Sequence, residues 1–244
     1  MRVRLGPAAL LVVAWLGTAH GYELLRVNHD PCARGDRHLF WRPPEVAVSG
    51  DPLPDAFRSI VVDAWQRWNL SVPGFRFRGG SGPACTRDGV AAVSIADRAC
   101  DLGDFGDALA ITRSVWKDSG ELVDADVTFR SNTFVLGDAG VFRQVAMHEL
   151  GHVLGLDHSD ACGKSGDGTL MRGVLTIPPI LDAPQADDVS GAQFIYPSSS
   201  SGGDGTVPEG ANSCAINAAP GHRVAWPFGL IPLLLFWRWV RRGN

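Results

Sequence analysis

The chain has 244 residues, of which 45% are hydrophobic, and its formal net charge is −4 at pH 7. That length accommodates one globular domain of ordinary size together with additional segments. The slightly acidic balance lacks the basic face that binding to DNA or RNA requires, so we expect no nucleic-acid partner.

The first 21 residues have the order of charge and apolarity that is typical of a signal peptide. Positive charges at Arg2 and Arg4 precede the apolar stretch LGPAALLVVAWLG, which is too short to span a membrane well, and small residues follow it. We therefore predict a signal peptide over residues 1–21, cleavage before Tyr22 and export of the protein. A buried N-terminal helix is the alternative interpretation of this stretch.

Residues 22–197 are predicted to form the folded domain. In the segment DPLPDAFRSIVVDAWQRWNL, apolar residues at helical spacing predict a helix that begins near Asp51 and Pro52. Three short β-type runs bounded by Gly and Asp follow it along the chain: GFRFRGG, GVAAVSIAD and DALAITRSVW.

The segment ELVDADVTFRS, residues 121–131, alternates between apolar and polar side chains. One face has Val123, Ala125, Val127 and Phe129, and the other has Asp124, Asp126 and Thr128. This alternation predicts a half-buried strand near the edge of a sheet.

Two further helices are predicted after this strand. The segment VFRQVAMHELGHVLGL is apolar on nearly all sides, and PQADDVSGAQFIYP predicts a helix that begins at Asp182 or Pro184 and stops at Pro197. One helix, then strands, then two helices predict an α+β domain in which helices pack on a mostly extended sheet.

The chain after the domain has two parts. Residues 198–213 are rich in Ser and Gly and predict a flexible linker. Residues 214–244 run from Cys214 through an apolar stretch to Arg241 and Arg242, which resembles the C-terminal sorting signals of some Gram-negative bacterial surface proteins. In such signals the apolar part is removed and the cysteine region stays attached to the surface. A simple C-terminal membrane anchor is the alternative, and either interpretation places the exported protein at a membrane or cell surface.

The five cysteines fit a protein of an oxidising compartment. Cys214 lies beyond the linker, which leaves four cysteines in the domain and three possible pairings. We favour Cys85 with Cys100 and Cys32 with Cys162, although the sequence alone does not decide between the pairings.

The motif HELGHVLGLDH predicts a metal site within the apolar helix. His148 and His152 are four residues apart, so both side chains lie on one helical face and can bind one ion. Gly155 predicts the end of the helix, and the turn there brings His158 back as a third imidazole. Three histidines with an open fourth position are typical of catalytic zinc, and coordination would also account for histidines in an apolar helix.

Glu149 adjoins the first of these histidines. Zinc lowers the pKa of a bound water to about 7, so a carboxylate beside it can act as the general base near neutral pH. We therefore predict that Glu149 takes a proton from the zinc-bound water and passes it to the leaving amine.

The motif resembles the extended metzincin signature, and Ser159 after the third histidine resembles the matrixin branch of that group. The resemblance covers most of residues 40–197. It implies a metzincin or zincin-like catalytic domain with a twisted, mostly parallel mixed sheet and three helices, of which one carries the HExxH motif. It also implies that ELVDADVTFRSN borders the substrate cleft, that ADDVSGAQFIYP is the closing helix, and that Met171 in GTLMRG forms the Met-turn beneath the zinc. An ordinary core methionine is the alternative for Met171.

The sequence also departs from the animal matrixins. No cysteine-switch sequence precedes the domain, and although Cys32 could cap the zinc as a thiolate, a disulfide is favoured in an exported chain. No histidine occurs between residues 39 and 147, so a second, structural zinc is not predicted. Calcium is a second candidate cofactor, although loop and turn roles are favoured for the acidic residues that could bind it: Asp97, Asp101, Asp104, Asp107 and Asp124.

The remaining histidines and two tryptophans have simpler interpretations. His29, His38 and His222 lack ligand spacing and are expected to be surface groups. Trp65 and Trp68 fit the packing of the first helix.

Three functions are compatible with this pattern. The first is a secreted or surface-attached zinc endopeptidase, a monomer that hydrolyses peptide bonds in a protein or peptide substrate bound extended along the edge of the sheet. The second is a surface binding or adhesion module with a structural zinc, for which the carboxylate of Glu149 would have no use. The third is a zinc hydrolase for non-peptide amides, which would share the same site.

Overall fold

The computed structural model describes residues 21–33 and 35–198. The predicted signal peptide up to His20, the linker beyond Ser198, the C-terminal segment and His222 lie outside the described residues. Within the described part of the chain, no helix is long and apolar enough to cross a membrane. The helices are α1 (Asp55–Ser71), α2 (Ala139–Leu154) and α3 (Ala186–Ile195), with short 3-10 turns η1 (Cys100–Leu102), η2 (Phe134–Gly137) and η3 (Ala161–Gly163). The strands are β1 (Glu23–Leu24), β2 (Phe40–Trp41), β3 (Glu45–Ser49), β4 (Arg76–Gly79), β5 (Val90–Ala96), β6 (Ala110–Trp116), β7 (Glu121–Arg130) and β8 (Leu156–Asp157).

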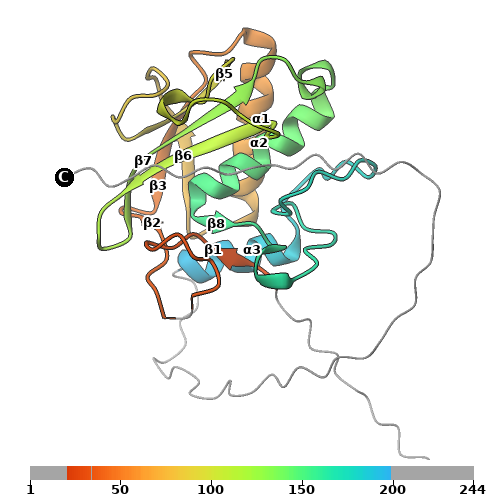
Figure 1. Ribbon diagram of the computed structural model, residues 1–244. Helices are drawn as coiled ribbons and strands as arrows, with labels where there is room; N and C mark the ends of the chain where they lie inside the picture. Colours follow the sequence, from red (N-terminus) through yellow and green to blue (C-terminus); the bar gives the residue numbers. More distant parts are fainter. Residues whose placement is uncertain (1–20, 34, 199–244) are drawn as a thin grey trace, which may run out of the picture.

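A six-stranded mixed sheet forms one layer of the domain (Figure 1). Strands β2, β7, β5, β3 and β4 follow one another in this order and are parallel. Strand β6 is antiparallel to β7. Val127 pairs with both Val93 and Thr112, so β5 and β6 lie on opposite sides of β7. The predicted α+β class, with a mostly parallel mixed sheet and three helices, is confirmed.

The predicted strand in residues 121–131 is present, but the prediction that it is half-buried and near a sheet edge is wrong. This segment is β7, which has neighbours on both sides, and the edge position belongs to β6. Asp124 and Asp126, on its polar face, have no exposed surface. That face is covered by the loop before β6, from which Asp101 reaches Arg113 of β6 at 2.6 Å.

Helices α1 and α2 pack against each other and cover the apolar face of the sheet (Figure 1). Phe142 of α2 lies between α1 and the sheet, with ring centroids 4.8 Å from Phe57 and 4.4 Å from Phe129. The predicted packing role of Trp68 is also observed, because its side chain is 1% exposed and its indole nitrogen donates to the Met147 carbonyl at 2.9 Å. These contacts fix α2, which carries the histidine motif, against both α1 and the sheet.

Two helices begin later than the sequence predicts. Helix α1 starts at Asp55 because the preceding residues form a turn, in which the Leu53 amide donates to the Gly50 carbonyl at 2.9 Å. Helix α3 starts at Ala186, where Gln185 and Asp188 form a capping box.

The N-terminal segment is joined to the chain after α2. Strand β1 pairs antiparallel with β8, and a disulfide links Cys32 to Cys162. The second disulfide links Cys85 to Cys100. Both favoured pairings are therefore confirmed, and the first of them excludes Cys32 as a thiolate ligand for zinc.

Candidate metal centre

The first two histidines of the motif come from the buried interior of α2. The helix begins at a cap in which the Asp138 carboxylate accepts hydrogen bonds from Gly140 N at 2.8 Å and Val141 N at 3.0 Å. His148 and His152 are 3% and 1% exposed, and they occupy the same helical face one turn apart. The packing of α2 therefore holds both imidazoles within the domain.

A left-handed residue ends α2 and returns the chain toward the site. Gly155 has φ 107°, and a Cβ added there would lie 2.6 Å from the Leu39 carbonyl oxygen, so a side chain would be both strained and obstructed. The next residues form β8, and His158 follows it directly. The turn that the sequence predicts at Gly155 is thus the turn that brings His158 back.

Donors from distant segments satisfy the C-terminal carbonyls of α2. Trp41 Nε1 donates to Val153 O at 2.7 Å, and the Tyr196 hydroxyl donates to Leu154 O at 2.9 Å. The Gly155 amide closes the last helical turn onto the carbonyls of residues 151 and 152. The last turn of a helix usually has unpaired carbonyl groups, so these bonds stabilise the end that carries His152.

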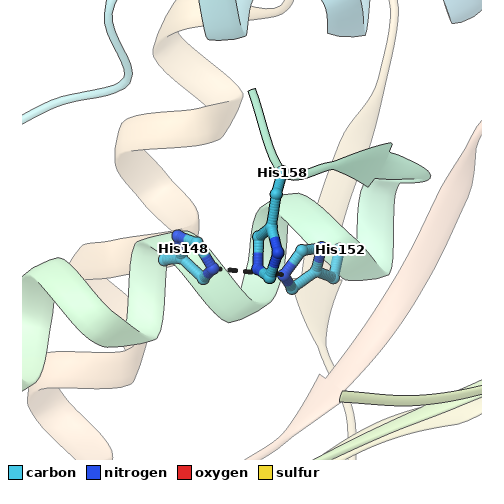
Figure 2. Close-up of side chains that lie close together, drawn as sticks. All are labelled: His148, His152 and His158. Carbon is cyan, nitrogen blue, oxygen red and sulfur yellow. Dashed lines mark hydrogen bonds between the residues drawn. The ribbon is translucent and has the colours of Figure 1, made fainter. Parts of the chain in front are cut away.

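The three imidazoles converge through their Nε2 atoms (Figure 2). His152 Nε2 lies 3.1 Å from His148 Nε2 and 3.2 Å from His158 Nε2. One ring nitrogen from each of the three residues lies within 4.8 Å of the others, which makes this the one group able to hold a metal ion among the described residues. For tetrahedral zinc with bonds of 2.0–2.1 Å, ligand nitrogens are about 3.3 Å apart, close to the two shorter separations.

The tautomers of the two helical histidines suit a metal. His148 Nδ1 lies 2.8 Å from Leu170 O, and His152 Nδ1 lies 2.9 Å from Leu156 O. A carbonyl oxygen only accepts, so each Nδ1 is the donor and each Nε2 presents a lone pair to the centre. Lone pairs that face one another at this distance repel, and a cation between them would remove that repulsion. The residues present therefore fit zinc.

Burial keeps these imidazoles neutral, which is the form that binds metals. It lowers the pKa of His148 to about 3, with a further lowering from His158. Burial alone lowers the pKa of His158 to about 4, and burial with the two neighbouring imidazoles lowers the pKa of His152 well below its usual value.

Glu149 lies beside this cluster and is 2% exposed. Its Oε2 accepts a hydrogen bond from the Thr112 hydroxyl of β6 at 2.6 Å. Burial raises the pKa of Glu149 to about 7, while the Thr112 hydrogen bond opposes the rise. A carboxyl with such a pKa exchanges protons near neutral pH, as a general base must.

Met171 lies against α2 at Gly151 and is 2% exposed. Its carbonyl accepts from Ser159 N at 2.9 Å, just beyond His158. The Asp188 carboxylate of α3 accepts from Leu170 N at 2.9 Å and from Met171 N at 3.0 Å. The turn at Met171 is therefore held by the closing helix, and Leu170 in turn orients His148.

A mostly apolar cavity of about 120 Å³ adjoins His148. Its walls come from α2 and from the segment between Gly168 and Leu181. The Gln144 side chain, which lines it, accepts a hydrogen bond from Leu181 N at 3.0 Å. The cavity is therefore an apolar space next to the histidine cluster.

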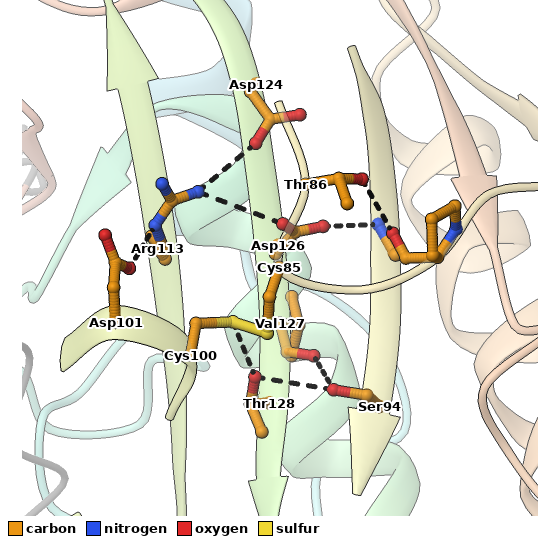
Figure 3. Close-up of a disulfide and its surroundings, with 12 residues drawn as sticks. Cys85, Thr86, Ser94, Cys100, Asp101, Arg113, Asp124, Asp126, Val127 and Thr128 are labelled. Carbon is orange, nitrogen blue, oxygen red and sulfur yellow. Dashed lines mark hydrogen bonds and ion pairs between the residues drawn. A yellow bond between two sulfur atoms is a disulfide. The ribbon is translucent and has the colours of Figure 1, made fainter. Parts of the chain in front are cut away.

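The outer face of the sheet holds a second polar group, which Figure 3 shows beside the Cys85–Cys100 disulfide. Arg113 is 5% exposed and forms ion pairs with Asp101 at 2.6 Å and with Asp124 at 3.5 Å. Burial raises the pKa of Asp124 to about 6, opposed by Gly89 N and Arg113. Burial and the Asp124 charge raise the pKa of Asp126 to about 7, opposed by Ala92 N and Arg113.

Among the described residues, the aspartates considered for calcium do not form a cluster that could hold a metal ion. Asp101 and Asp124 both pair with Arg113, and the other three are exposed loop residues: Asp97, Asp104 and Asp107. Of the expected surface histidines, His29 is exposed. His38 is half-buried, with its ring between Phe40 and Phe194 at centroid distances of 6.1 and 5.8 Å.

Two residues of the site were absent from the sequence prediction. Thr112 lies in a strand whose apolar pattern gave no sign of a contact with Glu149, 37 residues later. Asp188 follows Asp187 at the start of a helix, where acidic residues are common for capping alone. Its capping-box position was the available signal, but the contact with Met171 depends on tertiary structure.

Comparison with known proteins identifies the family to which this chain is similar. A family model described as Matrixin (peptidase M10) matches residues 54–197, more than half of the chain. The matched region includes α1, the sheet from β4 onward, the histidine cluster and α3. No curated protein matches the chain.

Proposed function

The chain belongs to the matrixin family of zinc metallopeptidases, and we propose that it is an exported or surface-attached zinc endopeptidase. The observation that carries the proposal is the convergence of the Nε2 atoms of three histidines beside a buried carboxylate. In this proposal His148, His152 and His158 bind zinc, and Glu149 is the general base.

Zinc, when bound, would polarise the substrate carbonyl and make water more acidic. Glu149 would take the proton of the attacking water and deliver it to the nitrogen of the leaving amine. The burial of Glu149 beside the three histidines supports this role. Met171 would form the apolar floor below the histidines.

Strand β6 is the edge strand of the sheet on the side of Glu149, so an extended peptide can add to it by backbone hydrogen bonds. In this proposal β6 borders the substrate cleft, in place of the segment 121–132 that the resemblance implied. The cavity beside His148 favours an apolar substrate side chain next to the scissile bond.

The location of the protein is also part of the proposal. The order of charge, apolar stretch and small residues over residues 1–21 supports export. Both disulfides fit an oxidising compartment. Residues 214–244 would attach the protein to a bacterial cell surface, with or without removal of the apolar part.

The experiment compares the wild-type protein with Glu149→Gln, using casein and a peptide library with and without a chelator. We expect zinc-dependent cleavage by the wild type, normal zinc content in the variant, and a loss of at least about 100-fold in its rate. Full activity of Glu149→Gln would refute the mechanism. A zinc-loaded wild type that cleaves no peptide would instead favour the binding module or the amide hydrolase.

A further inference from the structure

Thr112 is in hydrogen-bond contact with the carboxylate of Glu149. It lies in β6, has no exposed surface, and its hydroxyl oxygen is 2.6 Å from Glu149 Oε2 and 3.2 Å from Glu149 O. We propose that Thr112 is a positioning residue, whose hydroxyl fixes which oxygen of Glu149 faces the reacting water. The inference rests on the proposed function, in which Glu149 is the base.

The hydroxyl has one proton, and both neighbouring oxygens of Glu149 are acceptors. The shorter distance assigns the proton to the carboxylate, and 2.6 Å is typical of a strong hydrogen bond to an ionised acceptor. With Oε2 engaged by Thr112, Oε1 is the oxygen that receives the proton from water.

Glu149 needs such a partner because its backbone does not determine where its oxygens lie. The terminal torsion of a glutamate is broad, so packing of α2 places the side chain without selecting the rotation of the carboxylate. Catalytic groups must be held to within about 0.5 Å of their productive geometry. The Thr112 hydroxyl supplies the missing constraint on that rotation.

Thr112 is itself well fixed. Its backbone pairs with Val127 in the antiparallel ladder between β6 and β7. Threonine is branched at Cβ, which restricts χ1 in a strand, so the direction of the hydroxyl follows from the position of the strand. Because β6 is also the proposed substrate strand, Thr112 sets the position of the base relative to the peptide.

The test replaces Thr112 by Val, which keeps the shape and removes the donor, and by Ser, which restores the donor with a freer χ1. We expect Thr112→Val to lower kcat about 10- to 100-fold with KM within about twofold, and Thr112→Ser to recover most of the loss. Zinc content should stay at the wild-type level in both variants.

The matched control is Thr128→Val, the same change in the neighbouring strand. Thr128 is 2% exposed and lies on the opposite face of the sheet, next to Ser94 and Cys100. We expect wild-type kcat and KM for this variant. An equal loss of kcat in Thr128→Val would show that any buried hydroxyl matters for folding, and would refute the assignment.

A second comparison uses Glu149→Asp, whose shorter side chain withdraws the carboxylate from Thr112. In that background Thr112→Val should cause no further loss of kcat, because Thr112 acts through the carboxylate. Additive losses of kcat, or a Thr112→Val variant with wild-type kcat, would overturn the inference. The proposed function would still hold in that case, because the wild-type enzyme would be active. Failure of the zinc-loaded wild type to cleave peptides would refute the proposed function itself.

Discussion

Replacement of Gly151 by alanine has two opposed effects on α2, one from helix propensity and one from core packing. Alanine is more stable than glycine in a helix interior by about 1 kcal/mol, so propensity alone predicts stabilisation. An added Cβ would overlap the Met171 sulfur and lie 3.1 Å from Met171 Cε and 3.2 Å from Trp68 Cζ2. Met171 and Trp68 are 2% and 1% exposed, so neither has room to move away. Overpacking of this kind costs about 1–3 kcal/mol, and packing should prevail.

We expect Gly151→Ala to be about 1 kcal/mol less stable than the wild type, with a Tm lower by roughly 2–4 °C. Urea denaturation at a fixed free zinc concentration measures this difference. Gly137→Ala is the control, because a Cβ there meets no atom within 4 Å. The Gly151→Ala, Met171→Ala double variant should lose less free energy of unfolding than the two single variants lose in sum. A Gly151→Ala protein stabilised by about 1 kcal/mol would refute the reasoning.

Asp188→Asn removes one of the two carboxylate oxygens that accept hydrogen bonds from the Met171 turn. Zinc affinity, measured by chelator competition, should therefore fall about 10- to 100-fold. An unchanged affinity would contradict this expectation. Burial raises the pKa of Asp126 to about 7, above an unfolded value of about 3.9, so its contribution to stability is full below pH 4 and is lost as pH rises toward 7. In the wild type, Asp126 should lower the free energy of unfolding by an amount on the order of a few kcal/mol between pH 4 and 8, and Asp126→Asn should remove this contribution. Urea denaturation in the presence of a chelator measures the change, and an unchanged pH dependence would contradict the burial argument. The paired change of Cys32 and Cys162 to Ser should cost about 2–4 kcal/mol in the same assay, and equal stability would show that the link does not restrict the unfolded chain.

Local sequence patterns predicted the elements whose causes are themselves local. The spacing of His148 and His152 and the glycine at position 155 depend only on helix geometry and on a left-handed cap, and the structure has both. The alternation in β7 is also present, but it marks a polar face that is not exposed to solvent. Asp124 and Asp126 are buried because Arg113 and the loop before β6 cover them. Such burial depends on residues outside the strand, so the pattern could not separate an edge from an interior strand.

The parts of the site that the sequence did not predict are contacts between distant segments. Thr112 reaches Glu149 across 37 residues, and Asp188 reaches Met171 across 17. Each donor or acceptor is an ordinary residue for its own element. Only the packing of β6 on α2, and of α3 beneath the Met171 turn, gives these residues their place at the site.

The capped end of α2 has a consequence for motion. Helices usually open from their termini, and amide hydrogens in a fraying last turn exchange with solvent long before the domain unfolds. In α2 that turn is bonded to Trp41 and Tyr196, and Gly155 O accepts from Leu25 N at 2.8 Å. These partners come from both ends of the domain, so the turn cannot open while they stay in place. Amide exchange at residues 151–155 is therefore expected to require unfolding of the whole domain, and the turn after His152 to be among its slowest parts to exchange.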